Sequence, residues 1–158
     1  EWQDVHEQLV YQVKPLSYKI NEVNAKGDAE KEVNYDAIPS IVYTWPEVAS
    51  VGLPEEQLKD RKIPYCVGTY PFTGAGRARC MGETDGFVKM LSHTKTDRIL
   101  GVHIIGPRAA DMIAEAVLAI ETGASSEDIS RVIHGHPTFS EALQESAMVA
   151  QECSIYVG

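Results

Sequence analysis

The order of the hydrophobic patterns is the feature that most constrains the fold. Short runs rich in β-branched and aromatic residues occur between residues 38 and 105, and apolar residues recur at three- and four-residue steps from residue 109 onward. A series of strands followed by a run of helices is typical of an α+β fold, whereas regular alternation would favour a parallel sheet. We therefore expect an α+β domain, with an antiparallel sheet and helices packed on one face.

Local signals place the individual elements. The strand signal is carried by five segments, at residues 38–44, 48–52, 65–72, 86–92 and 99–105. The polar stretch 94–98 joins the last two and predicts a hairpin. A short helix is expected over 53–58, because Pro54 suits a first helical turn and acidic residues follow it.

The last third of the chain carries helix boundaries as well as helical periodicity. The stripe that begins at Ala109 ends near Gly123, which is a plausible C-cap. Ser125 followed by Asp128 three residues later predicts a capping box for a second helix. Thr138 followed by Glu141 predicts the same device at the start of a third.

The first 32 residues differ from the remainder. Apolar residues between Trp2 and Val13 form a helical stripe, Pro15 would end it, and residues 24–32 are polar like a connector. We treat 1–32 as an unassigned lead segment or connector and 33–158 as the folded domain.

Composition excludes several classes of function. The chain of 158 residues has 14 basic and 23 acidic residues, a formal charge of −9. Nucleic acid and anionic membranes need a basic surface, so neither is expected as a partner. No apolar run approaches the roughly 18 residues of a membrane span. The cysteines, Cys66, Cys80 and Cys153, lack metal-ligand spacing and fit reduced structural thiols, so no metal is expected.

The segment His134-Gly-His136-Pro137-Thr138-Phe-Ser-Glu141 carries the chemistry. A histidine titrates near neutral pH, and a carboxylate on one ring nitrogen would leave the other free to accept a proton. Glu141 also suits a purely structural role as the acceptor of a capping box. The two interpretations exclude each other only partly, because a carboxylate has two oxygens. The His136–Pro137 bond is predicted to be cis, which would turn the chain before the helix.

Other catalytic motifs are weak. Residues 74–79 begin like a G-x-G-x-x-G loop, but Arg79 replaces the third glycine, so a turn with two basic residues is the better interpretation. No Walker-type lysine and no nucleophile elbow occurs, which leaves a hydrolase built on the His–Glu pair without a convincing nucleophile.

Several blocks together resemble one family. Residues 33–39, 42–52 and 134–141, with 101–106 and 112–117 between them, are similar to the C-terminal interface domain of the dihydrolipoamide dehydrogenases. The resemblance extends from about Val33 to about Glu152. Glutathione reductases and other flavin disulfide reductases share the His-Pro-Thr…Glu skeleton, so the interface domain of such a relative is the nearest alternative.

The resemblance implies a function shared between subunits. His136 would be the base that takes the proton from the dihydrolipoamide thiol, Glu141 would orient it, and the backbone of His136, Pro137 and Thr138 would lie against the partner's flavin. The parent enzymes use FAD and NAD, form homodimers, and meet a lipoyl-bearing subunit in the bacterial cytoplasm or the mitochondrial matrix.

The sequence also departs from the parent family. The FAD-binding motif, the redox cysteine pair and the NAD domain do not occur in it, and Trp45 replaces a residue that is usually smaller or polar. We therefore expect no cofactor on this chain alone. A free-standing, non-catalytic dimerisation module is the second hypothesis.

Overall fold

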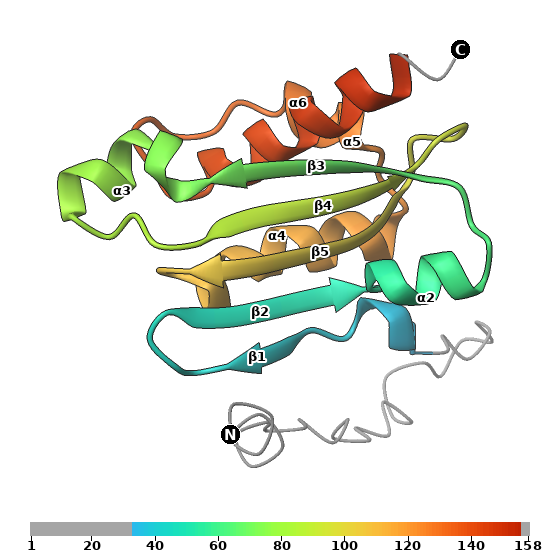
Figure 1. The fold of residues 1–158 in the computed structure, drawn as a ribbon, viewed down its shortest axis with the longest axis horizontal. Helices are drawn as coiled ribbons and strands as arrows, with labels where there is room; N and C mark the ends of the chain where they lie inside the picture. The colour runs from blue at the N-terminus through green and yellow to red at the C-terminus, as the bar shows by residue number, and fades with distance from the viewer. Residues whose placement is uncertain (1–32, 156–158) are drawn as a thin grey trace, which may run out of the picture.

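One antiparallel sheet with the strand order β1-β2-β5-β4-β3 forms the centre of the molecule (Figure 1). The computed structural model describes residues 33–155. Each neighbouring pair of strands runs antiparallel, and β4 and β5 form the predicted hairpin. The strands are β1 (Ser40–Val42), β2 (Glu47–Gly52), β3 (Tyr65–Pro71), β4 (Phe87–His93) and β5 (Ile99–Gly106).

Three helices from the last third of the chain cover one face of this sheet (Figure 1). They are α4 (Ala109–Thr122), α5 (Ser126–Arg131) and α6 (Glu141–Ile155). The predicted α+β class is confirmed. The shorter elements are α2 (Glu55–Asp60), α3 (Gly76–Met81) and two 3₁₀ turns, η1 (Tyr35–Ala37) and η2 (Phe72–Gly74). In the described part of the chain, no helix has the length and apolarity needed to cross a membrane.

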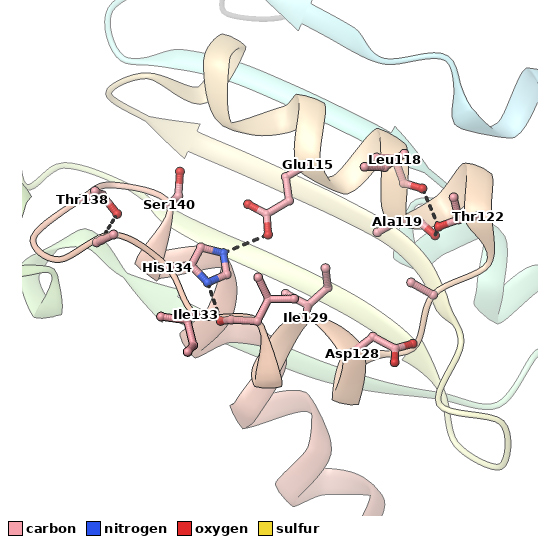
Figure 2. A pocket seen from close by; sticks show the side chains of 13 residues that line it. Glu115, Leu118, Ala119, Thr122, Asp128, Ile129, Ile133, His134, Thr138 and Ser140 are labelled. Carbon is pink, nitrogen blue, oxygen red and sulfur yellow. Dashed lines mark hydrogen bonds and ion pairs between the residues drawn. The ribbon is translucent and has the colours of Figure 1, made fainter.

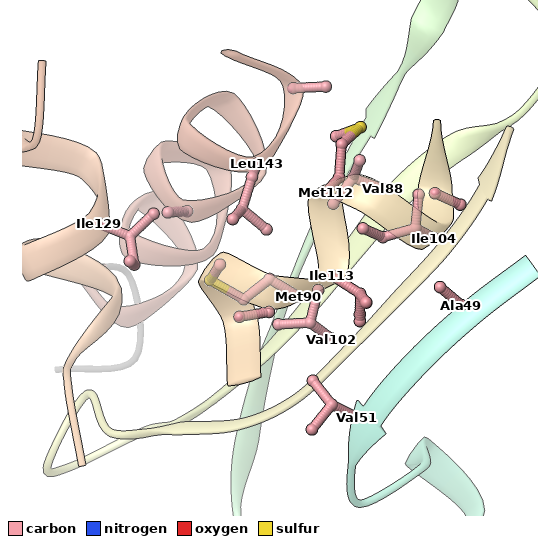
Figure 3. Close-up of a cluster of buried hydrophobic side chains, with 14 of the residues drawn as sticks. Ala49, Val51, Val88, Met90, Val102, Ile104, Met112, Ile113, Ile129 and Leu143 are labelled. Atoms are coloured by element: carbon pink, nitrogen blue, oxygen red, sulfur yellow. The ribbon is translucent and has the colours of Figure 1, made fainter. Parts of the chain in front are cut away.

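The core lies between the sheet and these helices (Figure 3). Successive side chains of a strand point to opposite faces, so alternate residues of β4 and β5 meet the apolar stripes of α4 and α6. Burial of each large apolar side chain contributes about 1.5–3 kcal/mol, which makes this layer the main source of stability. Its largest members include Val88, Met90, Val102, Ile104, Ile113 and Leu143.

Tertiary and local caps fix the helix ends. Glu47 of β2 accepts a hydrogen bond at 2.9 Å from the backbone N–H of Ala110, at the start of α4. Gly123 ends that helix with φ of 70°, as predicted. The capping box of Ser125 and Asp128 is formed at the start of α5, which confirms the second predicted cap.

Two local predictions need correction. The segment predicted as a basic turn contains the helix α3, because Phe72, Ala75 and Ala78 are buried at three-residue spacing and anchor it on the core. The strand predicted over 38–44 shortens to β1, with η1 before it. The predictions for residues 1–32 lie outside the described residues.

Candidate functional site

The predicted His–Glu pair is formed in the structure. His136 Nδ1 lies 2.7 Å from Glu141 Oε1. Because a carboxylate only accepts hydrogen bonds, Nδ1 carries the hydrogen of a neutral ring, and Nε2 is then left with the lone pair. The imidazole side chain is 77% exposed, whereas the carboxylate is 25% exposed. The arrangement is an oriented base on the surface, able to take a proton from a group brought to it.

The second oxygen of Glu141 has a structural role. The backbone N–H of Thr138 donates to Glu141 Oε2 at 2.7 Å. The reciprocal half of the predicted capping box is not formed: the Thr138 hydroxyl donates to the carbonyl of Gly135, and α6 begins at Glu141 itself. Glu141 therefore has both of the roles considered for it, because one oxygen binds the backbone at the start of α6 and the other binds His136.

The surroundings of Glu141 favour its charged form. The hydrogen bond from the Thr138 N–H, followed by the one from His136, lowers the pKa of this carboxyl below its usual value. A carboxylate that stays charged near neutral pH keeps accepting from His136 and so holds its tautomer.

The loop that carries the pair is open on its outer side. His136 and Pro137 are both exposed, and the peptide bond between them is cis, as predicted. The fold puts α3 rather than a phosphate-binding loop at residues 76–81, and no such loop occurs elsewhere in 33–155. The outer side of this loop is therefore accessible to another molecule.

A second histidine of the same loop was missed as a functional candidate. The side chain of His134 is only 6% exposed, and its Nε2 lies 2.8 Å from Oε1 of Glu115 on α4 (Figure 2). The available signal was the position of Glu115, three residues after Met112 and four before Ala119, both buried. A carboxylate in register with an apolar helix stripe requires a polar partner.

A groove of about 590 Å³ borders His134 and Glu115. It is lined by α4, α5 and the loop before α6, and His134 and Glu115 lie in its wall (Figure 2). Leu118, Val132 and Ile133 line it while remaining 63%, 49% and 95% exposed. An apolar surface next to the exposed base indicates a face that meets another molecule.

The sequence matches a family model over residues 38–147, and that model describes the dimerisation domain of pyridine nucleotide-disulphide oxidoreductases. The chain belongs to this family. The match includes the whole sheet, α4, α5 and the loop with the His–Glu pair. The expected resemblance to an interface domain is thereby confirmed.

Relatives of this dimerisation domain are dihydrolipoyl dehydrogenases by name. The chain is 56% identical over 124 residues to "Dihydrolipoamide dehydrogenase" of Chaetomium thermophilum, covering 78% of the chain and 25% of the relative. It is 54% identical to "Dihydrolipoyl dehydrogenase 1, mitochondrial" of Arabidopsis thaliana, covering 79% of the chain and 25% of that protein. The chain thus spans about a quarter of the length of the relatives it matches.

Solved structures agree on the fold. LpdA of Mycobacterium tuberculosis superposes with a TM-score of 0.72 at 21% identity, over 78% of this chain and 26% of LpdA. The flavoprotein disulfide reductase RclA of Escherichia coli superposes with a TM-score of 0.65 at 27% identity, over 77% of this chain and 26% of RclA. At 21% identity, the likeness to LpdA shows the fold alone.

Proposed function

We propose that this dimerisation domain supplies His136 and Glu141 to the FAD and disulfide site of a partner subunit, for NAD-linked oxidation of dihydrolipoamide. The observation that carries the proposal is the contact of 2.7 Å between His136 and Glu141 on an otherwise exposed imidazole. Identity above 50% to dihydrolipoyl dehydrogenases supports lipoamide as the substrate class.

The proposed step is a proton transfer. Nε2 of His136 accepts the proton of a substrate thiol, and Glu141 stabilises the imidazolium that results. The thiolate left behind is the nucleophile in thiol–disulfide exchange. FAD and NAD, held by the other domains of the parent enzyme, would supply the electron transfer, while the backbone at 136–138 would face the flavin ring.

The same proposal includes a homodimer, in which the base of one subunit serves the flavin of the other, and encounters with a lipoyl-bearing subunit. The names of the Arabidopsis relative and several others place those proteins in mitochondria. We accordingly favour the mitochondrial matrix over a bacterial cytoplasm for this protein.

A hybrid enzyme tests the proposal. Residues 33–155 replace the corresponding quarter of the Chaetomium thermophilum relative, which supplies the FAD and NAD domains. His136→Gln should lower kcat for dihydrolipoamide by about 10²–10⁴-fold, because general-base catalysis is lost. Flavin absorbance should stay unchanged. His93→Gln, in the β4–β5 hairpin, is the matched control; equal activity of the His136 variant and this control would refute the assigned base.

The non-catalytic alternative has its own measurement. An absorbance scan and intact mass of the purified 158-residue chain would show whether it carries a flavin. A colourless chain whose hybrid is also inactive would favour a dimerisation module without redox activity.

A further inference from the structure

Both ring nitrogens of His134 face hydrogen-bond acceptors. Nδ1 lies 2.9 Å from the carbonyl oxygen of Val132, and Nε2 lies 2.8 Å from Oε1 of Glu115 (Figure 2). A backbone carbonyl cannot donate, and a charged carboxylate cannot donate either. A neutral imidazole has only one N–H, so it would satisfy one acceptor and direct a lone pair at the other.

Water has little access to the two ring nitrogens of His134. The side chain of His134 is 6% exposed, so neither nitrogen is freely hydrated. The Val132 carbonyl also accepts from Nε2 of Gln144 at 2.9 Å, which uses its second lone pair. The imidazolium form donates on both sides and leaves every one of these groups paired.

The surrounding charges also favour an imidazolium. Glu115 faces it from α4 and is 30% exposed. Asp128 of α5 lines the same groove, and Glu141 at the start of α6 is close enough for the charge of His134 to lower the pKa of its carboxyl slightly further. The nearest titratable side chain in the sequence is that of His136.

The buried ring also ties the catalytic loop to two helices. Glu115 links it to α4, and Gln144 of α6 donates to the carbonyls of both Ser130 and Val132. His136 stands two residues beyond the anchored ring. The direction in which its imidazole projects therefore depends on how firmly His134 is held.

We propose that His134 is a buried imidazolium paired with Glu115, and that this charged bridge positions His136 for proton transfer. The positioning role rests on the function proposed above; the charge of the ring does not. His134 and Glu115 are positioning residues, because they act through the loop and not on the substrate.

The charge is tested on the full chain by ¹⁵N spectra of labelled histidine, with His134 assigned through His134→Gln. The unmodified protein should show two protonated-type nitrogens for His134 at neutral pH. Glu115→Gln should convert one of them to the lone-pair type, because the charge that holds the second proton is gone. Glu121→Gln, an exposed position of the same helix, is the control and should change nothing. A neutral His134 ring in the unmodified chain would overturn the proposal.

The positioning role is tested in the hybrid enzyme. Glu115→Gln should lower kcat about tenfold with KM nearly unchanged, as is usual when the support of a catalytic histidine is removed. The ratio of unmodified to variant kcat should rise with pH, because the variant ring loses its second proton as pH increases. A ratio that does not change with pH would refute the positioning role.

The two proposals fail in different ways. If His136→Gln keeps full activity, the proposed base is wrong while the ¹⁵N spectra still decide the charge of His134. If His136→Gln is inactive and Glu115→Gln is fully active, the base stands and the positioning role is refuted.

Discussion

At the residue scale, single carboxylates bind several parts of this molecule at once. Glu141 holds the helix entry with one oxygen and His136 with the other. Glu55 at the start of α2 pairs with Lys89 of β4, accepts from the Tyr65 hydroxyl at 2.8 Å and pairs with Lys59 at 2.9 Å. Hydrogen bonds from Lys89, then Lys59, then Tyr65 lower the pKa of Glu55 to about 2.

The low pKa of Glu55 predicts a stability that depends on pH. Because the folded pKa lies below the ordinary 4.5, the stabilisation is complete above pH 4.5 and is lost as pH falls towards about 2. Glu55→Gln should lower the free energy of unfolding by about 1–2 kcal/mol at neutral pH, since partial exposure screens the pairs. Urea unfolding of both proteins at neutral and acidic pH measures this.

The neighbouring Glu56→Gln serves as control for Glu55→Gln, because Glu56 is exposed on the same helix. Equal losses for the two variants, or a loss for Glu55→Gln that persists in acid, would contradict the prediction.

At the scale of elements, the placement of α6 on β3 depends on a missing side chain. Gly68 of β3 is buried, and a Cβ built on it would lie 1.9 Å from the carbonyl oxygen of Ser146 and 2.5 Å from the backbone nitrogen of Ala150. The helix backbone therefore rests directly on the strand. This close approach sets the position of α6, whose first residue is Glu141.

Gly68→Ala is predicted to destabilise the fold by about 3 kcal/mol, the upper end for overpacking, because backbone atoms cannot move aside as a side chain does. Gly76→Ala is the control: the nearest atom to its Cβ is Pro137 Cβ at 4.0 Å, and alanine suits the helix α3. It should change stability by less than about 1 kcal/mol. Thermal unfolding of both variants decides; similar melting temperatures would show that α6 has room to shift.

At the scale of the whole molecule, the helical layer presents an apolar face. Leu118, Val132 and Ile133 are exposed around the groove beside the loop that carries His136. Soluble proteins rarely leave such a patch uncovered, and a face that pairs with its own copy through a two-fold axis would cover it. The proposed function needs the same face, because the base has to reach a second subunit.

We therefore expect the 158-residue chain to be a dimer. The double variant with Leu118→Asp and Ile133→Asp should be monomeric, because the dimer interface would bury two unpaired carboxylates from each subunit. Sedimentation velocity across a concentration series measures the shift. Tyr43→Asp changes an equally exposed residue between β1 and β2, outside the groove, and should leave the dimer intact. An unmodified chain that stays monomeric at high concentration would contradict the prediction.

Local features were predictable from the amino-acid sequence alone. These features are the β4–β5 hairpin, the caps at Gly123 and Ser125, the cis bond before Pro137 and the contact of His136 with Glu141, and each one joins segments that are neighbours in the sequence. Backbone preferences and short-range hydrogen bonds decide such features, so the residue pattern carries them.

Only the tertiary structure decided the rest. Packing on the core made the segment after η2 the helix α3, and the fold brought Glu115 to His134 across 19 residues. Each of these depends on which surfaces pack together, because burial makes an unpaired polar group or an uncovered apolar one costly. The His136–Glu141 pair was therefore predictable from one short segment, whereas the contacts that hold its loop exist only once α4 and α6 are both packed on the sheet.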